Sequence, residues 1–498
     1  MICQNRPKSF SSFLQLLALT GLLLLPASRA NAQVAGATLS GTVTDVQGTV
    51  IPNAEILIKN LAKGTSASVS ANADGLYSAP NLLPGKYDVK ASAAGFATEM
   101  LSGITLTVGA QMMLNINVKV GQISQTVEVT AAAPQVELTN ATIGAVLDES
   151  TVRELPLNGR DWTSLASLQA GVTSDASLQP SATQGAGFAR GQRGLGVQLT
   201  VNGNRPEQNN YRIDGIGVND FANGGMGSAT GATLGVDAIQ EFSVLTSDYG
   251  AEYGRTSGGV VNAITRSGAN QLHGTLFWFL RSNKLDGKGF FDPVRPPFHR
   301  NQFGAAEGGP IQKDKTFFFA NYEGFRQTQG VSSVDVVPSA DTDKGILHNA
   351  DGTTTTVTVD PLVAPFLALW HLPNPNALIG AGLTGTYTFT GIQFQSEDFV
   401  SARVDHKFSQ NDSLFGSYQI DRSSSIAPDS LGDLLNGTTS RHQLVSLEES
   451  HVFSSTFVNS ARLGYNRIFT LLGASLGAIN PAAGNPALGA APDRKSVV

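Results

Sequence analysis

Residue types that could carry out catalysis or bind a metal are sparse in this sequence of 498 residues. The 7 histidines include no pair at the spacing of a His-Glu-x-x-His metal site, and no phosphate-binding Gly-x-x-x-x-Gly-Lys-Ser/Thr loop occurs. The segment GASLG at residues 473–477 formally matches the nucleophile elbow of hydrolases. In that family the catalytic histidine follows the serine, whereas no histidine follows Ser475. The sequence therefore predicts neither an enzyme nor a metal or cofactor site.

The composition narrows the class of protein further. Lys and Arg total 33 against 39 Asp and Glu, and charged residues make up 14% of the chain, where about 25% is typical. Such a chain has little positive charge with which to neutralise nucleic-acid phosphates. Cys3 is the single cysteine, which excludes a disulfide scaffold. The 54 glycines and 25 phenylalanines favour a β protein, including a β protein of the membrane.

Residues 1–32 have the pattern of a secretory signal peptide. A positively charged start is followed by an apolar run at residues 13–25 and by small residues that predict cleavage between Ala32 and Gln33. The apolar run is shorter than the about 18 to 20 residues that a membrane-spanning helix needs. Because no later apolar run is long enough either, a mature chain in a membrane would have to cross it as a closed barrel.

Residues 33–122 predict a small β-sandwich, because about seven short alternating runs are separated by turn residues. We expect Gly75 and Gly85 at turn positions that need positive φ, and Tyr77 and Tyr87 on half-buried strand faces. The segments GTVTDVQGTVIPNAEILIKN, ANADGLYSAPNLLPGKYDVKASAAGF and LNINVKVG resemble the carboxypeptidase-regulatory-like domain, which has a carbohydrate-binding-like fold. The resemblance leaves two roles open, carbohydrate or partner binding and a structural spacer.

Residues 123–140 are predicted to be a linker. They contain an alternating segment that could add as a strand to the sheet edge of another protein. The segment resembles the box through which outer-membrane receptors contact the energy-transducing protein TonB, and its residues are Thr126, Val127, Glu128, Val129 and Thr130. The alternative is that these residues form the last strand of the sandwich, followed by a spacer.

Residues 141–268 contain a predicted helix that starts after Asp161, a possible N-cap, and includes Trp162, Leu165 and Leu168. The segments VQLTVNGNRPEQNNYRIDGIGVND and VDAIQEFSVLTSDYGAEYGRTSGGVVNAITRSGANQLHG resemble the plug domain of TonB-dependent outer-membrane transporters. A plug packs inside a polar lumen; the alternative is a loop-rich soluble α/β domain. The positions that match the plug pattern are Arg193, Gly194, Asp214, Gly215, Tyr253, Gly254, Gly258 and Gly259, with Gln192 in place of the isoleucine that the family has before Arg-Gly.

Residues 269–498 alternate between apolar and polar positions. In residues 399–408, for example, Val400 and Val404 alternate with Arg403 and Asp405, which is the pattern of a transmembrane barrel strand. The segment RNQFGAAEGGPIQKDKTFFFANYEGFRQ resembles the first barrel hairpins of Oar-like TonB-dependent receptors. An aromatic girdle at the membrane interface is predicted from Phe277, Trp278, Phe317, Phe318 and Phe319.

The predicted fold class is mainly β, with an N-terminal β-sandwich, an α/β plug domain and a partial transmembrane antiparallel β-barrel. A barrel around a plug needs about 22 strands, whereas residues 269–498 hold about seven to nine, so we expect a fragment that ends within the barrel. The resemblance implies a receptor of the cell outer membrane for active uptake of a bulky solute. Its expected partners are a TonB-type energy transducer, outer-membrane lipid and an unidentified solute such as a carbohydrate, but no nucleic acid. The alternative is a secreted or periplasmic carbohydrate-binding or adhesive β protein.

Overall fold

The computed structural model describes residues 36–121, 126–130, 142–174, 198–220, 223–225, 227–254, 256–288, 295–367, 369–454 and 457–485. The predicted signal peptide with its cleavage site at Ala32 and Gln33 lies outside the described residues, as do Arg193 and Gly194 of the plug pattern. None of the helices in the described part of the chain is long and apolar enough to cross a membrane.

The N-terminal region forms two sheets that share one core. Its strands are β1 (Ala37–Asp45), β2 (Glu55–Asn60), β3 (Ser66–Ser70), β4 (Leu76–Leu82), β5 (Gly85–Ser92), β6 (Thr98–Leu106), β7 (Gln111–Met113), β8 (Ile116–Val118) and β9 (Thr126–Thr130). One sheet has the order β4-β1-β7, with β8 also on β1, and the other has the order β3-β2-β5-β6-β9. Buried residues of both sheets, such as Leu39 and Ile56, pack in the same cluster, as expected for a sandwich.

The structure confirms the predicted glycine turns of the sandwich but buries its two tyrosines more deeply than predicted. Gly75 has φ +69° and Gly85 has φ +151°, which confirms the positive φ predicted at both turns. Tyr77 and Tyr87 are fully buried rather than half-buried. Burial is possible because each hydroxyl donates a hydrogen bond of 2.6 Å to a backbone oxygen, that of Leu114 and that of Leu83 respectively.

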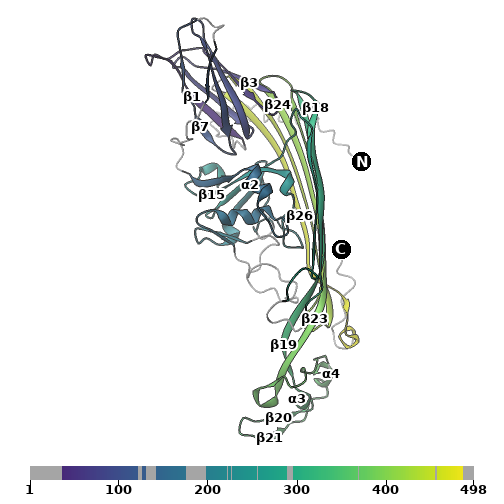
Figure 1. Cartoon of the computed structure of the whole chain (residues 1–498). Helices are drawn as coiled ribbons and strands as arrows, with labels where there is room; N and C mark the ends of the chain where they lie inside the picture. The colour runs from purple at the N-terminus through teal and green to yellow at the C-terminus, as the bar shows by residue number, and fades with distance from the viewer. Residues whose placement is uncertain are drawn as a thin grey trace, which may run out of the picture. The chain divides into compact units, whose positions relative to one another are not determined.

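The second region is an α/β unit built on a five-stranded sheet with the order β10-β15-β16-β13-β14 (Figure 1). These strands are β10 (Ile143–Leu147), β13 (Asn210–Ile213), β14 (Ile216–Gly217), β15 (Ile239–Ser247) and β16 (Val260–Thr265). A separate pair joins β11 (Val172–Ser174) to β12 (Leu199–Val201). The helical segments are α2 (Glu149–Glu154) and the 3₁₀ turns η1 (Trp162–Leu168), η3 (Pro206–Gln208), η4 (Val236–Ala238) and η5 (Ala251–Tyr253).

The predicted helix start at Asp161 is confirmed. The Asp161 carboxylate accepts a hydrogen bond of 3.0 Å from the backbone N–H of Thr163, so it caps η1 as an N-cap residue does. Trp162 is buried, and its ring meets Phe242 edge-on with 5.1 Å between the centroids. Leu168, in contrast, is mostly exposed, since η1 is a short 3₁₀ turn that buries only part of its apolar residues.

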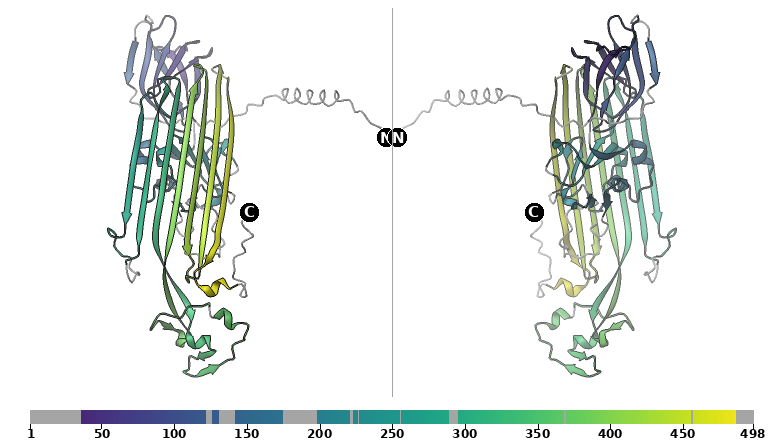
Figure 2. Two further views of the ribbon diagram at one scale, coloured as in Figure 1. Left: turned by 90° about the vertical axis from the view of Figure 1, so that its right-hand side faces the viewer. Right: turned by 90° about the vertical axis from the view of Figure 1, so that its left-hand side faces the viewer.

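The third region is one long antiparallel sheet with the order β17-β18-β19-β23-β24-β25-β26. Its strands lie side by side in Figure 2, and within the described residues β17 and β26 are its outer strands. The bounds are β17 (His273–Ser282), β18 (Phe298–Gln312), β19 (Thr316–Pro338), β23 (Thr384–Lys407), β24 (Asp412–Pro428), β25 (Leu434–Ser454) and β26 (Phe457–Ala478). The short β22 (Leu378–Ile379) also pairs with β23. Seven long strands agree with the predicted number.

The remaining elements lie between or after the long strands. The connection from β19 to β23 contains α3 (Ala340–Asp343), β20 (Ile346–His348), β21 (Thr354–Thr356), α4 (Ala364–Leu367), β22 and η6 (Gly380–Gly382). The turn η7 (Pro481–Gly484) follows β26.

The long sheet has a polar buried face and an apolar exposed face. Arg403 is 2% exposed, whereas its neighbour Val404 is 46% exposed. The same alternation recurs over parts of β18, β19, β24 and β25. This confirms the two-residue period predicted from the sequence, with the sides assigned as in a strand that faces lipid. Polar residues on the buried face include Gln302, Glu323, Gln327, Glu397, Ser417 and Glu448, and exposed apolar residues include Leu276, Trp278, Val334, Phe394 and Leu463.

The predicted aromatic girdle is wrong for part of its residues. Phe317 and Phe319 are buried on the polar face, where Lys63 and Arg266 lie over their rings at 5.2 and 5.5 Å. Phe277 likewise lies under the guanidinium of Arg160, at 4.1 Å. A run of three phenylalanines carries no alternation, so sequence alone could not tell which rings point inward. Trp278 is on the exposed face, as predicted.

Candidate functional site

A hairpin of the plug-like unit presents a carboxylate to the long sheet. Asp214 and Gly215 form the two-residue turn between β13 and β14, and their φ angles of +48° and +75° are those of a type I′ turn. The Asp214 carboxylate is held within the plug-like unit by Thr265, whose N–H and hydroxyl donate hydrogen bonds of 2.9 and 2.7 Å. The turn is therefore fixed with its charge buried, and that charge needs a partner.

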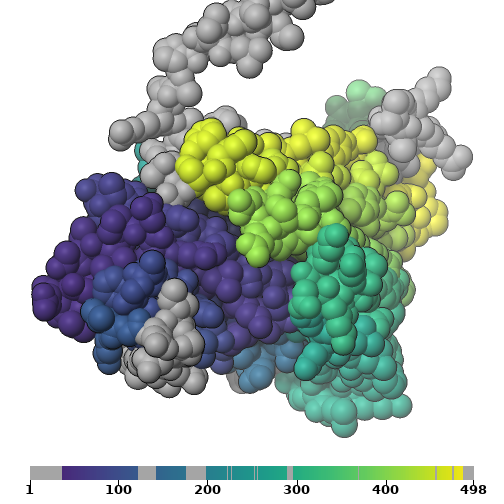
Figure 3. Space-filling model, turned by 90° about the horizontal axis from the view of Figure 1, so that it is seen from above, coloured from purple at the N-terminus to yellow at the C-terminus, as the bar shows by residue number. Residues whose placement is uncertain are grey.

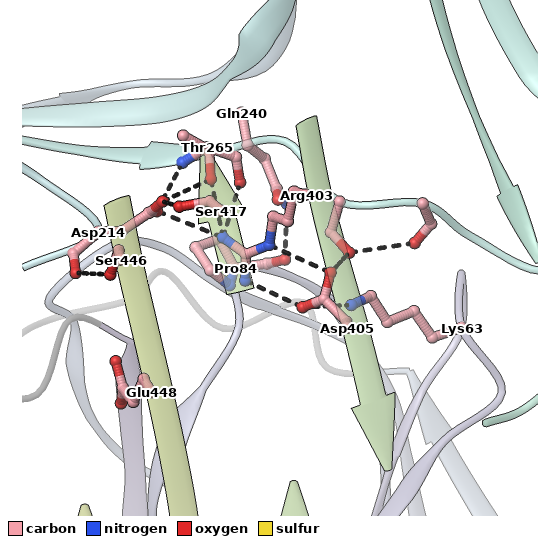
Figure 4. Close-up of polar contacts among 12 residues, drawn as sticks. Lys63, Pro84, Asp214, Gln240, Thr265, Arg403, Asp405, Ser417, Ser446 and Glu448 are labelled. Atoms are coloured by element: carbon pink, nitrogen blue, oxygen red, sulfur yellow. Dashed lines mark hydrogen bonds and ion pairs between the residues drawn. The ribbon is translucent and has the colours of Figure 1, made fainter. Parts of the chain in front are cut away.

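Arg403 of β23 supplies the partner. Its Nη1 lies 3.3 Å from Asp214 Oδ1, while its Nε and Nη2 donate hydrogen bonds of 3.1 and 2.9 Å to the carboxylate of Asp405 (Figure 4). Ser417 of β24 donates a further hydrogen bond of 2.9 Å to Asp214. One buried guanidinium thus joins a carboxylate of the plug-like unit to a carboxylate of the sheet.

The sandwich also contributes a charged residue to the ion pairs around Arg403 and Asp405. Lys63, in the turn between β2 and β3, has its Nζ 3.5 Å from Asp405 Oδ1. Burial lowers the pKa of Lys63, because desolvation disfavours the ammonium ion, while Asp405 partly opposes this shift. We call the set that joins the three regions the three-part cluster; it consists of Lys63, Asp214, Thr265, Arg403, Asp405 and Ser417.

A second ion-pair group, centred on Arg160, ties the plug-like unit to the sheet. The Arg160 guanidinium contacts Asp237 at 2.5 Å within the plug-like unit and Glu323 of β19 at 3.0 Å. Gln302 of β18 donates to Glu323 with a distance of 2.8 Å, and the N–H of Gly235 donates to its other oxygen with 3.1 Å. Glu323 therefore accepts hydrogen bonds both from the plug-like unit and from the sheet.

The sandwich contacts the sheet at a second carboxylate, Glu448 of β25. Asn81 of the sandwich donates to Glu448 with a distance of 2.9 Å, and Arg462 of β26 pairs with it at 2.6 Å. Figure 3 shows the purple and blue surface of the sandwich next to the green and yellow strand ends. A cavity of about 160 Å³ lies beside the contact, and its lining includes Lys63, Asn81, Tyr87, Lys407 and Glu448.

The sandwich and the plug-like unit meet at Gln240 and Glu241 of β15. Gln240 donates a hydrogen bond of 2.9 Å to the Pro84 carbonyl, and Glu241 accepts one from the N–H of Val108. Burial raises the pKa of Glu241 to about 8, because the apolar surroundings disfavour its charged form.

The raised pKa of Glu241 predicts a loss of stability as pH increases. The folded protein keeps this proton up to a pKa of about 8, whereas the unfolded chain releases it near 4.5. The free energy of unfolding should therefore fall as pH rises between these two values. Chemical denaturation at pH 5 and pH 8 measures this fall, which should shrink in Glu241→Gln. The control Glu154→Gln, at an exposed position, should leave the fall unchanged; an equal fall in wild type and Glu241→Gln would refute the assignment.

The structure places the other plug-pattern residues at the opposite end of β16 from Asp214. An added Cβ at Gly258 would lie 2.4 Å from Asn209 Oδ1, and one at Gly259 would lie 2.7 Å from the Val201 side chain. These two positions therefore need glycine for close backbone approach. Tyr253 ends η5 and Gly254 follows it, and Asn210 donates a hydrogen bond of 3.0 Å to the Tyr253 carbonyl.

The alternating segment Thr126–Thr130 forms β9. It pairs in parallel with β6, from Thr98 opposite Thr126 to Ser102 opposite Thr130. It is the terminal strand of its sheet, so its second edge has no strand partner among the described residues. This arrangement matches the alternative of a last sandwich strand, and the coupling role stays a prediction.

Substitution of Gly215 should disturb the junction with the sheet. In Gly215→Ala the new Cβ would lie 2.2 Å from Arg462 Nη1, at a φ of +75° that L-residues avoid. Gly203→Ala is the matched control, since Gly203 has φ +76° with open space around it. We expect about 1–2 kcal/mol of lost stability in the control from backbone strain alone, and a larger loss in Gly215→Ala. Equal losses in denaturant titrations would show that Arg462 moves away freely.

Sequence reasoning missed the residues that join the regions. It identified Arg403 and Asp405 only as polar positions of a strand, and it did not single out Lys63 or Arg160. One signal was present, because an arginine and an aspartate two residues apart lie on the same face of a strand. The partner Asp214 is 189 residues from Arg403, which no local pattern reveals.

Two family models match the chain. The one described as an outer membrane beta barrel domain matches residues 264–496, and the one described as a carboxypeptidase regulatory-like domain matches residues 38–119. The chain is 27% identical over 396 residues to the TonB-dependent transporter Oar of Myxococcus xanthus, and the match covers 74% of this chain and 35% of Oar. The chain is a homologue of this transporter. The resemblance to Oar-like receptors seen in the sequence is thereby confirmed.

Solved structures of outer-membrane proteins are also similar to the chain. The transporter YddB of Escherichia coli has 13% identity and a TM-score of 0.42, over 65% of this chain and 39% of YddB. The ferric enterobactin receptor PfeA of Pseudomonas aeruginosa has 15% identity and a TM-score of 0.37, over 65% of this chain and 41% of PfeA.

The barrel family model and the homology to Oar place the chain in the outer membrane, as the sequence predicted. The mainly β fold, with a sandwich, a plug-like α/β unit and barrel strands, is confirmed as well. The sequence relative, Oar, is described as a transporter. The chain spans about a third of the length of Oar, 35%.

Proposed function

We propose that this chain acts in a TonB-dependent outer-membrane receptor for active uptake of a bulky solute. The observation that carries the proposal is the junction of the plug-like unit with the long sheet. The buried Arg403 and the partly buried Arg160 bind this unit to the polar face of a sheet whose other face is apolar. A unit held by buried charges against the inner wall of a membrane sheet has the arrangement expected of a plug.

Uptake requires the plug to move, and the three-part cluster is the main obstacle to such movement. Buried ion pairs are costly to break one partner at a time, since each separation leaves a charge without compensation. The work must come from a partner, and we infer a TonB-type energy transducer. It would add a strand to the open edge of β9, where backbone hydrogen bonds give a directional grip just ahead of the plug.

The carboxypeptidase-regulatory-like sandwich has a further role in this proposal. Lys63 and Asn81 of the sandwich contact Asp405 and Glu448 of the sheet, so the sandwich lies across the junction that must open. Binding of carbohydrate to this domain is part of the proposal because its fold resembles carbohydrate-binding domains. The alternative of a secreted or periplasmic β protein does not account for the apolar exposed face of the long sheet.

Single proline substitutions in β9 test the coupling step. The N–H groups of consecutive residues in a strand point to opposite edges, so Val127→Pro and Glu128→Pro remove donors from different edges. We expect the purified chain in detergent to bind the periplasmic domain of a TonB-type protein in fluorescence polarisation. One of the two variants should lose this binding, and the other should instead weaken the pairing with β6 and so the stability of the sandwich.

The control is Val69→Pro in β3, at the opposite edge of the same sheet, which should keep the binding of the TonB-type domain if the sandwich stays folded. Circular dichroism checks that folding for each variant. Absence of binding in the wild-type chain, or equal binding in both β9 variants, would contradict the proposed coupling segment.

A further inference from the structure

Two carboxyl groups on the polar face of the long sheet have no cationic partner. They belong to Glu397 of β23 and Asp421 of β24, and no ion pair joins either of them to a lysine, arginine or histidine in the described part of the chain. Other acids on this face are paired: Glu323 with Arg160, Asp405 with Arg403 and Lys63, and Glu448 with Arg462. The exception calls for an explanation, because a buried charge without compensation is strongly destabilising.

The two unpaired groups are neighbours. Glu397 lies opposite Ser423, and Asp421 lies opposite Phe399, so the acids occupy a diagonal position on one face of adjacent strands. Glu397 is 0% exposed. Two ionised carboxylates in this position repel each other unless something positive lies between them.

Each acid also has an oxygen atom that no donor of the described residues reaches. Glu397 Oε2 accepts hydrogen bonds from the hydroxyls of Ser228, at 2.7 Å, and of Thr230. Glu397 Oε1 and Asp421 Oδ1, in contrast, are buried atoms without a hydrogen-bond partner in the part of the chain that the structure describes. An ionised carboxylate oxygen can only accept, and buried polar atoms without a partner are rare in native structures. Two such atoms at one place point to a bound positive species.

We propose that Glu397 and Asp421 bind a divalent cation of the calcium type, with the hydroxyl oxygens of Ser228 and Thr230 as further ligands. All four side chains offer the hard oxygen atoms that Ca²⁺ takes, and a charge of +2 offsets both carboxylates. A single proton shared by the pair would leave one negative charge buried and uncompensated. The ion would join the plug-like unit to the sheet, because Ser228 and Thr230 belong to the former and the acids to the latter.

The position of the serine and threonine supports a structural role for this site. The segment that carries them is also tied to the strand next to Glu397, since the N–H of Ala229 donates a hydrogen bond of 2.7 Å to Ser423. Ser423 in turn shares a hydrogen bond of 2.6 Å with Ser440. A cation at Glu397 would complete a contact that otherwise consists of hydroxyl groups. A structural cation site of this kind goes beyond the proposed uptake function.

Calorimetric titration of the chelator-treated chain in detergent with CaCl₂ tests the proposal. We expect one Ca²⁺ per chain and a thermal transition that rises with Ca²⁺ concentration, as mass action requires. Glu397→Gln and Asp421→Asn should each weaken the affinity at least about tenfold, the loss known for altered metal-site partners. Asp398→Asn is the matched control, because Asp398 follows Glu397 on the opposite face and pairs with Arg326, and its affinity for Ca²⁺ should equal that of the wild type.

Two results would overturn the proposal. The first is no binding of Ca²⁺ by the wild-type chain; if the acids share only a proton, both variants should in addition be as stable as wild type at pH 5 but more stable at pH 8. The second is equal affinity in wild type, Glu397→Gln and Asp421→Asn. If a variant does not fold, Ser228→Ala, which removes one hydroxyl ligand and leaves the carboxylates, replaces it and should also lower the affinity.

Discussion

Replacement of Arg403 with methionine is expected to remove about 3–5 kcal/mol from the free energy of unfolding, the cost of breaking a buried pair by removing one partner. Methionine retains much of the side-chain length but leaves Asp214 and Asp405 buried without the guanidinium that both contact. The loss should appear in guanidinium titrations in detergent that follow the fluorescence of Trp162, because this tryptophan is buried in the core of the plug-like unit.

Arg153→Met is the matched control for this prediction. Arg153 pairs with Glu149 one helical turn away, and both side chains are about a third exposed, at 33% and 39%. Such a pair is worth about 0.3–0.5 kcal/mol, so the same change of residue type should have a small effect there. Lys63→Met should lie between the two, since Lys63 contacts only Asp405, at 3.5 Å, within the cluster. Equal stability of Arg403→Met and Arg153→Met would show that the three-part cluster does not hold the plug-like unit in place.

The sequence predicted the faces of the long sheet but not the contacts made across it. Alternation is a local property, so Val404 and Arg403 could be assigned to opposite faces from neighbouring letters alone. The contact between Arg403 and Asp214 depends on how β13, β14 and β16 are arranged, and that arrangement is set by the packing of the whole unit. The resemblance to plug domains singled out Asp214 and Gly215 but did not explain their structural role. In the structure, their turn carries the carboxylate that Arg403 binds.

The N-cap at Asp161 and the directions of Phe317 and Phe319 also differ in whether neighbouring residues determine them. The N-cap at Asp161 was predictable, because the capping carboxylate and the N–H that it satisfies are two residues apart. The inward direction of Phe317 and Phe319 was not, because the cations that cover their rings come from the sandwich and from the segment before β17. In this sheet, the buried rings of Phe317 and Phe319 lie under cations from distant parts of the sequence. An aromatic girdle therefore cannot be deduced from the positions of aromatic residues alone.

A second large effect is expected one residue away from the first, in Val404→Arg. Val404 is 46% exposed on the apolar face, so this substitution places a charge on the face that we expect to meet lipid. Arginine on the lipid face of a barrel costs about 2–4 kcal/mol near the bilayer midplane and less near the interfaces. The free energy of unfolding from lipid vesicles, measured by guanidinium titration, should fall by an amount in this range.

Val404→Leu is the control, because it keeps an apolar side chain at the same exposed position and should change the stability in vesicles little. Leu463→Arg on β26 repeats the test on another strand, where the leucine is 68% exposed. We therefore expect arginine to stabilise the protein at position 403 and to destabilise it at position 404, because consecutive residues of β23 face opposite sides of the sheet. If Val404→Arg and Leu463→Arg matched Val404→Leu in vesicles, the exposed face of the sheet would not lie in the bilayer.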